Sequence, residues 1–253
     1  MTAPVAKNNS SAKLISSAGG KRDRNRMIAI QAGVAVVLVG LIAVIGVSIA
    51  NKKSEKDAAA DRKAAAAAGP AVYKDGDLRF GNQDAKIVLQ VTEDLQCPAC
   101  AMYQAQVGPY IEGLIKENKV AVDYRTIGWL NSPNNEQYSS RAANASACVA
   151  EADKAKWLPW TNLMFSKQPP ESASGLPDST IVDITKQAGV TSPQVAECIT
   201  SGKYSDFITG VTNTTMKGGL QHTPTVKVNG TELKDTSPAG IKAAIEQAER
   251  VAK

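Results

Sequence analysis

The chain has 253 residues, enough for one globular domain together with additional segments. Its net charge of +5 is unevenly distributed, because residues 1–70 carry 11 basic and 4 acidic side chains whereas residues 71–253 carry 18 and 20. The chain beyond residue 70 is therefore close to neutral, which argues against a nucleic-acid-binding domain with a basic face.

The N-terminal region predicts a membrane anchor. Residues 1–26, rich in serine, alanine, asparagine and lysine, are expected to form a disordered cytoplasmic tail. Residues 27–50 are uncharged and mostly apolar, and about 20 such residues suffice for a transmembrane helix. Basic residues are denser before this run than after it, which favours a single-pass plasma-membrane protein whose C-terminal domain is extracytoplasmic.

A cleaved signal peptide is the alternative interpretation of the same run. Ser48-Ile49-Ala50 has the small-x-small form of a cleavage site. The apolar core of a signal peptide is usually about 7–15 residues long, however, and this run is much longer. We therefore expect an uncleaved anchor, followed by an alanine-rich, charged linker at 51–70 and a folded domain at 71–253.

The first half of the folded domain predicts a βαβ unit. Strands are expected near 78–80, 87–92 and 120–127, and a helix is expected from 97 to about 116. Strands that alternate with a helix in this way predict a mixed sheet covered by helices.

The second half of the domain predicts a helical insertion at about 134–217, followed by a hairpin. Candidate helices lie near 135–155, 157–167, 179–188, 193–201 and 204–217. Strands near 225–229 and 231–234 are joined by Asn229-Gly230, a strong hairpin-turn dipeptide. A last helix is expected from 239 to about 251.

Cys97-Pro98-Ala99-Cys100 lies between the strand at 87–92 and the following helix. The thiolate is the reactive form of cysteine, and a helix N-terminus lowers the pKa of a thiol. We expect Cys97 to be the exposed, attacking thiol and Cys100, one turn inside, to be the resolving thiol. A zinc site and an inert pair of cysteines are the alternatives. A zinc site needs four ligands, and the other two cysteines are distant single residues.

Cys148 and Cys198 are these other two cysteines, and each lies on a different predicted helix of the insertion. An even cysteine count in a domain outside the cytoplasm predicts a structural disulfide. Two free buried thiols and a second redox relay remain as alternatives.

Two motifs together carry a resemblance to a known family. The run 94–100 with its Cys-Pro-Ala-Cys motif, combined with His222-Thr223-Pro224-Thr225 before a strand, resembles the DsbA-like branch of the thioredoxin superfamily. The chain is most similar to the membrane-anchored actinobacterial type. The resemblance implies an α/β, thioredoxin-like fold with an inserted helical domain, in which Pro224 is a cis-proline facing the dithiol.

The resemblance also implies a function. Proteins of this type are thiol–disulfide oxidoreductases that introduce disulfides into reduced exported proteins. A quinone-linked membrane partner of the DsbB or VKOR type re-oxidises them. For this chain we expect no cofactor and no metal. A reductase, a disulfide isomerase and a dithiol protein that carries copper are the alternative functions.

Two positions depart from the family pattern. Ala99 replaces the histidine that DsbA has between its cysteines, and Val91 occupies the position where many relatives have an acidic residue. Weaker stabilisation of the thiolate predicts a reduction potential between those of thioredoxin and DsbA, nearer to DsbA. Candidate modulators are Thr223, His222 and Glu93, although a solvated carboxylate is the simpler interpretation of Glu93 and an inert loop residue that of His222.

Overall fold

A computed structural model describes residues 67 and 69–251 of the chain. The predicted tail, the predicted transmembrane helix at 27–50 and nearly all of the linker lie outside these residues. Among the helices that are described, none combines the length and the apolar character needed to cross a membrane.

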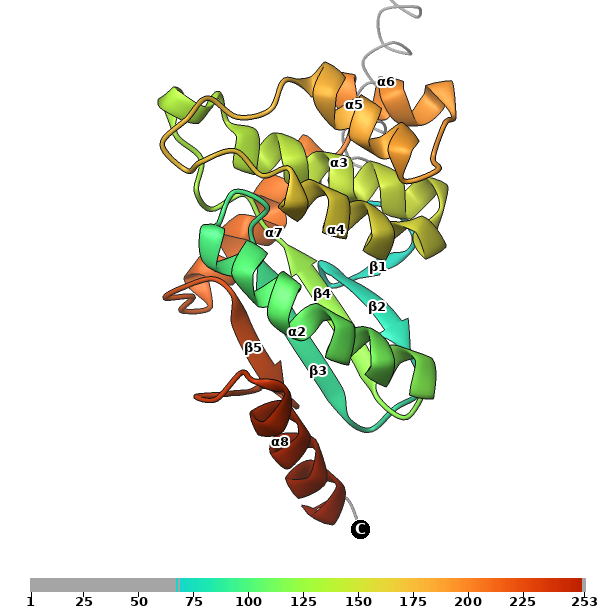
Figure 1. The fold of residues 1–253 in the computed structure, drawn as a ribbon, viewed down its shortest axis with the longest axis vertical. Coiled ribbons are helices and arrows are strands. Elements are labelled where there is room, and N and C mark those ends of the chain that lie inside the picture. The colour runs from blue at the N-terminus through green and yellow to red at the C-terminus, as the bar shows by residue number, and fades with distance from the viewer. Residues whose placement is uncertain (1–66, 68, 252–253) are drawn as a thin grey trace, which may run out of the picture. The chain divides into compact units, whose positions relative to one another are not determined.

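The centre of the folded domain is a six-stranded mixed sheet with the strand order β1-β2-β4-β3-β5-β6 (Figure 1). The parallel pair β3 and β4 flanks helix α2 in the chain, which confirms the predicted βαβ unit, whereas the other pairs are antiparallel. The strands are β1 (Tyr73–Lys74), β2 (Asp77–Gly81), β3 (Val88–Glu93), β4 (Ala121–Thr126), β5 (Thr225–Val228) and β6 (Thr231–Glu232). Strand β1, only two residues long, had no signal in the sequence.

The hairpin between β5 and β6 forms at the predicted dipeptide. Asn229 and Gly230 both have positive φ, 46° and 81°, as a tight hairpin turn of this kind requires. The backbone N–H of Val88 donates to the Asn229 side chain at 2.8 Å, so the turn is also joined to the start of β3.

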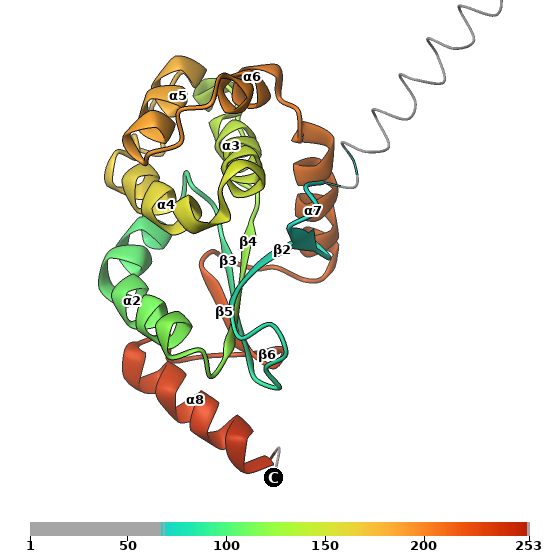
Figure 2. The same cartoon turned by 90° about the vertical axis from the view of Figure 1, so that its right-hand side faces the viewer.

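Helices cover both faces of the sheet. Helix α2 (Pro98–Glu117) begins directly after the N-cap residue Cys97, and helix α8 (Pro238–Val251) ends the described chain. Figure 2 shows α2 and α8 on one side of the sheet and α7 (Ser205–Lys217) on the other. Pro98 fits the first turn of α2 because its missing N–H would have no partner there.

The helical insertion lies between β4 and β5, where the sequence predicted it. It consists of the short 3₁₀ helices η1 (Pro133–Asn135) and η2 (Lys154–Lys156) and of α3 (Tyr138–Ala152), α4 (Trp157–Ser166), α5 (Asp178–Gln187), α6 (Pro193–Ser201) and α7. Trp157 and Trp160 are fully buried in its core. Each indole N–H has a partner, since Trp157 donates to Ser146 and Trp160 to Thr185 at 2.8 and 2.9 Å.

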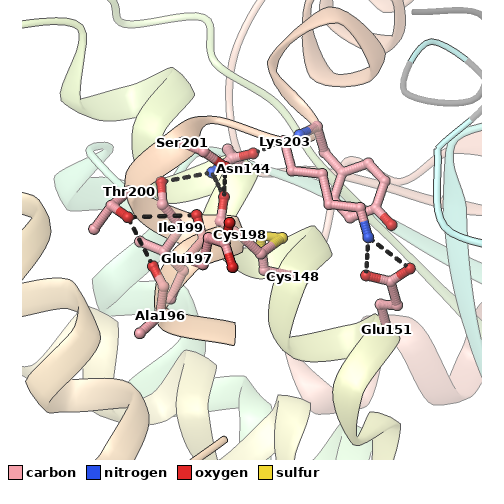
Figure 3. Close-up of a disulfide and its surroundings, with 11 residues drawn as sticks. Asn144, Cys148, Glu151, Ala196, Glu197, Cys198, Ile199, Thr200, Ser201 and Lys203 are labelled. Carbon is pink, nitrogen blue, oxygen red and sulfur yellow. Dashed lines mark hydrogen bonds and ion pairs between the residues drawn. A yellow bond between two sulfur atoms is a disulfide. The ribbon is translucent and has the colours of Figure 1, made fainter. Parts of the chain in front are cut away.

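A disulfide joins Cys148 on α3 to Cys198 on α6, 50 residues apart in the chain (Figure 3). The buried side chain of Asn144 reinforces this junction, because it donates to the carbonyl of Ile199 at 3.2 Å and accepts from the N–H of Tyr204 at 2.8 Å. Helix α3 is thus joined to α6 and to the start of α7 by covalent and polar contacts.

We predict that the double variant Cys148→Ala, Cys198→Ala is destabilised but active. Closing a loop of this length stabilises a fold by about 4 kcal/mol in the chain-entropy model, so urea denaturation should show a loss approaching that value. Exchange activity at low temperature should stay near the wild-type level, because the pair is structural. The Cys97→Ala variant keeps this disulfide and should lose less stability than the double variant, namely only what the Cys97 thiolate contributes to the reduced fold. Loss of turnover in a folded double variant would indicate a relay instead.

Candidate active site

Cys97 is the N-cap residue of α2, four residues after the end of β3, and Cys100 lies in the first turn of the helix. The Cys97 N–H donates to the carbonyl of Asp94 at 3.0 Å, and the Cys97 carbonyl accepts from the N–H of Ala101 at 3.2 Å. Residues 94–97 therefore form a tight loop that ends in the helix. Both Cys97 and Cys100 are free thiols in this structure.

The expectation that Cys97 is exposed is wrong. Cys97 is only 7% exposed and Cys100 1%. The reason is the loop at 222–225, which covers the start of α2 and contains a cis peptide bond between Thr223 and Pro224. The Cys97 thiol donates to the carbonyl of Thr223 at 3.4 Å, so the loop that the sequence placed opposite the dithiol is in direct contact with it.

The environment separates the pKa values of the two thiols. The pKa of Cys97 is lowered to about 6, chiefly by a hydrogen bond with the Cys100 thiol, and further by Thr223 and by the backbone N–H groups of Cys100 and Ala99. Burial raises the pKa of Cys100 far above its ordinary value, and the bond to Cys97 and the Cys97 charge add to this rise. At neutral pH, Cys97 is the thiolate and Cys100 the thiol.

Thr223 has two different relations to Cys97. Its carbonyl accepts a hydrogen bond only from the neutral thiol. Its hydroxyl is buried and has no hydrogen-bond partner in the described part of the chain, so it is free to donate to the thiolate. The Thr223 side chain contributes to the lowered pKa of Cys97.

Glu93 is not a solvated carboxylate, and that interpretation has to be corrected. It lies at the end of β3 and is 2% exposed, and its charge acts on Cys100 and Tyr103 of α2 and on Tyr124 of β4. Burial, followed by the nearby charge of Asp94, raises the pKa of Glu93 to about 8. Its charge in turn raises the pKa of Cys100, so Glu93 is a buried acid that acts on the resolving thiol.

Asp94 is a buried residue that sequence reasoning missed. Its carboxylate accepts hydrogen bonds from the N–H groups of Gln96, Trp129 and Leu130 at 2.8–2.9 Å and from the hydroxyl of Ser139. These donors come from the dithiol loop, from the segment after β4 and from α3. An aspartate whose side chain accepts from the backbone N–H two residues later is a common turn former. This local pattern is the only feature of the sequence that could have indicated a structural role for Asp94.

A dithiol at a helix start, in contact with a cis-proline loop beside a mixed sheet, is an arrangement shared with known proteins. Residues 74–247 match the thioredoxin family. The chain belongs to the thioredoxin family. Within this family it is of the DsbA-like type, in which a helical insertion interrupts the thioredoxin-like fold.

Solved structures support this assignment. Reduced DsbA from Mycobacterium tuberculosis is 32% identical, with a TM-score of 0.60 and coverage of 70% of this chain and 100% of the other. DsbG from the same organism is 32% identical, with a TM-score of 0.62 and coverage of 74% and 92%.

A curated relative from Rickettsia bellii, named as a protein-disulfide oxidoreductase, is 26% identical over 176 residues. The match covers 69% of this chain and 65% of that relative. The centre formed by Cys97, Cys100 and Pro224 is thus a thioredoxin-family centre with the chemistry for thiol–disulfide exchange.

His222, the only histidine of the chain, braces the cis-proline loop of this thioredoxin-family protein. Its ring nitrogens lie 3.0 Å from the carbonyl oxygen of Pro224 and 3.2 Å from a carboxylate oxygen of Glu232. No hydrogen bond joins the ring to Cys97 in the part of the chain that is described. The ring therefore holds the loop against β6 and does not replace the imidazole that Ala99 lacks.

A groove of about 670 Å³ runs beside the start of α2. Ala99, Pro224 and Leu233 give it apolar walls, and Glu232 and Lys234 lie at its polar side. The groove therefore lies along the cis-proline loop, next to the residue that follows Pro98 in the dithiol motif.

We predict that the alkylation rate of Cys97 in the reduced protein has its midpoint near pH 6. Only the thiolate reacts, and the free thiol has a pKa of about 8.5, whereas the contacts at the start of α2 lower that of Cys97 to about 6. Iodoacetamide labelling followed by mass spectrometry of the peptide would measure the profile. Faster labelling of Cys100, or a midpoint near the free value, would contradict the assignment of roles.

We predict that Glu93→Gln weakens the pH dependence of stability between pH 5 and 8. The unfolded chain releases this proton near pH 4.5, whereas the folded chain holds it to about pH 8. In this window the folded state binds the extra proton, so stability falls as pH rises, by at most about 1.4 kcal/mol per pH unit. Urea denaturation of the wild type and the variant at pH 5 and 8 would measure the difference, with both proteins in the Cys97–Cys100 disulfide form so that Cys97 does not titrate. Equal pH dependence would mean that Glu93 is already ionised in the fold.

Proposed function

We propose that this protein is a membrane-tethered thiol oxidase that introduces disulfides into exported proteins outside the cytoplasm. The observation that carries the proposal is the separation of the two thiols, since a Cys97 thiolate with a lowered pKa beside a buried, neutral Cys100 stabilises the reduced form. A stable reduced form makes the corresponding disulfide an oxidant.

The proposed reaction begins with the Cys97–Cys100 disulfide. A substrate thiolate attacks the sulfur of Cys97, and the Cys97–Cys100 bond breaks as Cys100 leaves and takes up a proton. A second substrate thiolate then attacks the substrate sulfur of the mixed disulfide and releases Cys97 as the thiolate. The substrate is oxidised to a disulfide, and the two electrons reside on the enzyme dithiol.

Glu93 and the cis-proline loop assist these steps. Glu93 is protonated at neutral pH and lies within electrostatic reach of Cys100, so it offers a proton to this sulfur as it leaves. The hydroxyl of Thr223 donates to the Cys97 thiolate that the second step releases. Pro224 lines the groove through which the substrate approaches.

Each turnover leaves the enzyme reduced, so the proposal requires a partner that removes two electrons. A quinone-linked membrane protein of the DsbB or VKOR type fits this requirement. Residues 27–50 support a location near such a partner, because their uncharged, apolar sequence is long enough for a transmembrane helix. The basic residues before this run favour an extracytoplasmic catalytic domain.

We predict a reduction potential between those of thioredoxin, about −270 mV, and DsbA, about −120 mV. The Cys97 pKa of about 6 lies between their nucleophile values of about 7 and about 3.5 and is closer to that of thioredoxin, so the potential should lie nearer to thioredoxin than the sequence alone suggested. Ala99→His should raise it, because an imidazolium stabilises the thiolate. Equilibration with glutathione would measure both proteins.

The same preparations would test the activity on a reduced, unfolded disulfide protein. Wild type should restore its native disulfides, Cys97→Ser should be inactive, and Cys100→Ser should accumulate mixed disulfides through Cys97. A wild-type potential at or below the thioredoxin value, without oxidative refolding activity, would instead support a reductase.

We predict that the full chain remains in the membrane fraction after carbonate extraction. An anchor at 27–50 would resist this treatment. If the catalytic domain lies outside the cytoplasm, protease added to protoplasts should digest it. A soluble product that begins near Asn51 would establish cleavage of the N-terminal segment.

A further inference from the structure

The helical insertion contacts the dithiol loop through one side chain in particular. The amide nitrogen of Gln168 donates to the carbonyl of Leu95 at 2.8 Å and to the carbonyl of Cys97 at 3.1 Å. Both partners are acceptors, so the NH₂ group must face them, which settles the orientation of the amide. Gln168 follows α4 and is 71 residues from Cys97 in the chain, so only the tertiary fold brings the two together.

The backbone around Gln168 holds this side chain in place. The Gln168 N–H donates to the carbonyl of Phe165 in the last turn of α4 at 3.2 Å, and Phe165 is buried in the core of the insertion. Pro169 and Pro170 follow, and each proline ring fixes its own φ angle. The carbonyl of Pro170 accepts from the side chain of Gln96 at 3.4 Å, which adds a second contact to the dithiol loop.

The Cys97 carbonyl is a sensitive point for the thiolate. As the N-cap carbonyl of α2 it accepts from the Ala101 N–H, and it carries a partial negative charge on the same residue as the thiolate. A second hydrogen bond, from Gln168, withdraws part of that charge. The bond also holds the Cys97 backbone at φ −77° and ψ 118°, the conformation in which the N–H groups of Ala99 and Cys100 lower the pKa of the thiol.

We propose that Gln168 is a positioning residue for Cys97, through which the helical insertion sets the reactivity of the dithiol. The inference rests on the proposed function in assigning Cys97 as the nucleophile. Gln168 touches none of the reacting sulfur atoms. It acts through the carbonyl groups of Leu95 and Cys97. Through this contact the helical insertion supports the geometry of the active site.

The test compares Gln168→Leu, which removes the donor and keeps the size of the side chain, with Gln187→Leu, a matched change at an exposed position of α5. The alkylation profile of Cys97 against pH, equilibration with glutathione and the melting temperature are measured for reduced protein. Gln168→Met, unbranched like glutamine, replaces the leucine variant if that variant fails to fold.

For Gln168→Leu we expect the thiolate fraction of Cys97 at pH 6 to fall about two- to fivefold, since one hydrogen bond contributes about 1 kcal/mol. The equilibrium with glutathione should shift toward the disulfide form of the enzyme, and Gln187→Leu should behave as wild type. A lower melting temperature with an unchanged alkylation profile would overturn the inference and leave Gln168 a structural residue.

The outcome is distinguishable from failure of the proposed function. A wild type without oxidative refolding activity, combined with the expected change in alkylation for Gln168→Leu, would reject the oxidase and retain the positioning role. A wild type with oxidase activity whose Cys97 alkylation profile responds equally to both glutamine substitutions would retain the proposed function and reject the positioning role of Gln168.

Discussion

The stabilisation of a thiolate on Cys97, at the N-terminus of α2, is the interaction on which the remaining features of the centre depend. A thiolate needs donors, and here the Cys100 thiol, the Thr223 side chain and backbone N–H groups lower the pKa of Cys97 within a covered site. Burial opposes the charge, so these donors have to be placed accurately. The end of β3, the cis-proline loop and the helical insertion meet at this point and hold them.

The adjacent carboxyl groups of Glu93 and Asp94 are both buried but differ in their hydrogen bonding. Asp94 receives four hydrogen bonds and joins the dithiol loop to α3 and to the segment after β4. One oxygen of Glu93 has no partner in the described structure, and burial raises the pKa of this residue to about 8. A fully bonded carboxylate suits a structural connection, whereas an unpartnered acid that keeps its proton suits proton transfer to a neighbouring sulfur.

The helical insertion has a part that stabilises the fold and a part that faces the chemistry. Its interior is held by the buried tryptophans and by the disulfide between α3 and α6. Its other contribution reaches the dithiol loop through Ser139, Gln168 and Pro170. The physical consequence is that the geometry at Cys97 depends on elements far from it in the chain.

The sequence by itself determined the βαβ unit, the place of the helical insertion and the hairpin at Asn229-Gly230. These features follow from local patterns, namely apolar periodicity and turn dipeptides. The placement of Pro224 opposite the Cys-Pro-Ala-Cys motif was implied by the family resemblance. Only the tertiary structure decided that Cys97 is covered, that Glu93 is buried, and that Asp94 and Gln168 hold the dithiol loop. Burial and hydrogen bonding at these positions depend on segments separated by 35 to 126 residues, and no local pattern contains that information.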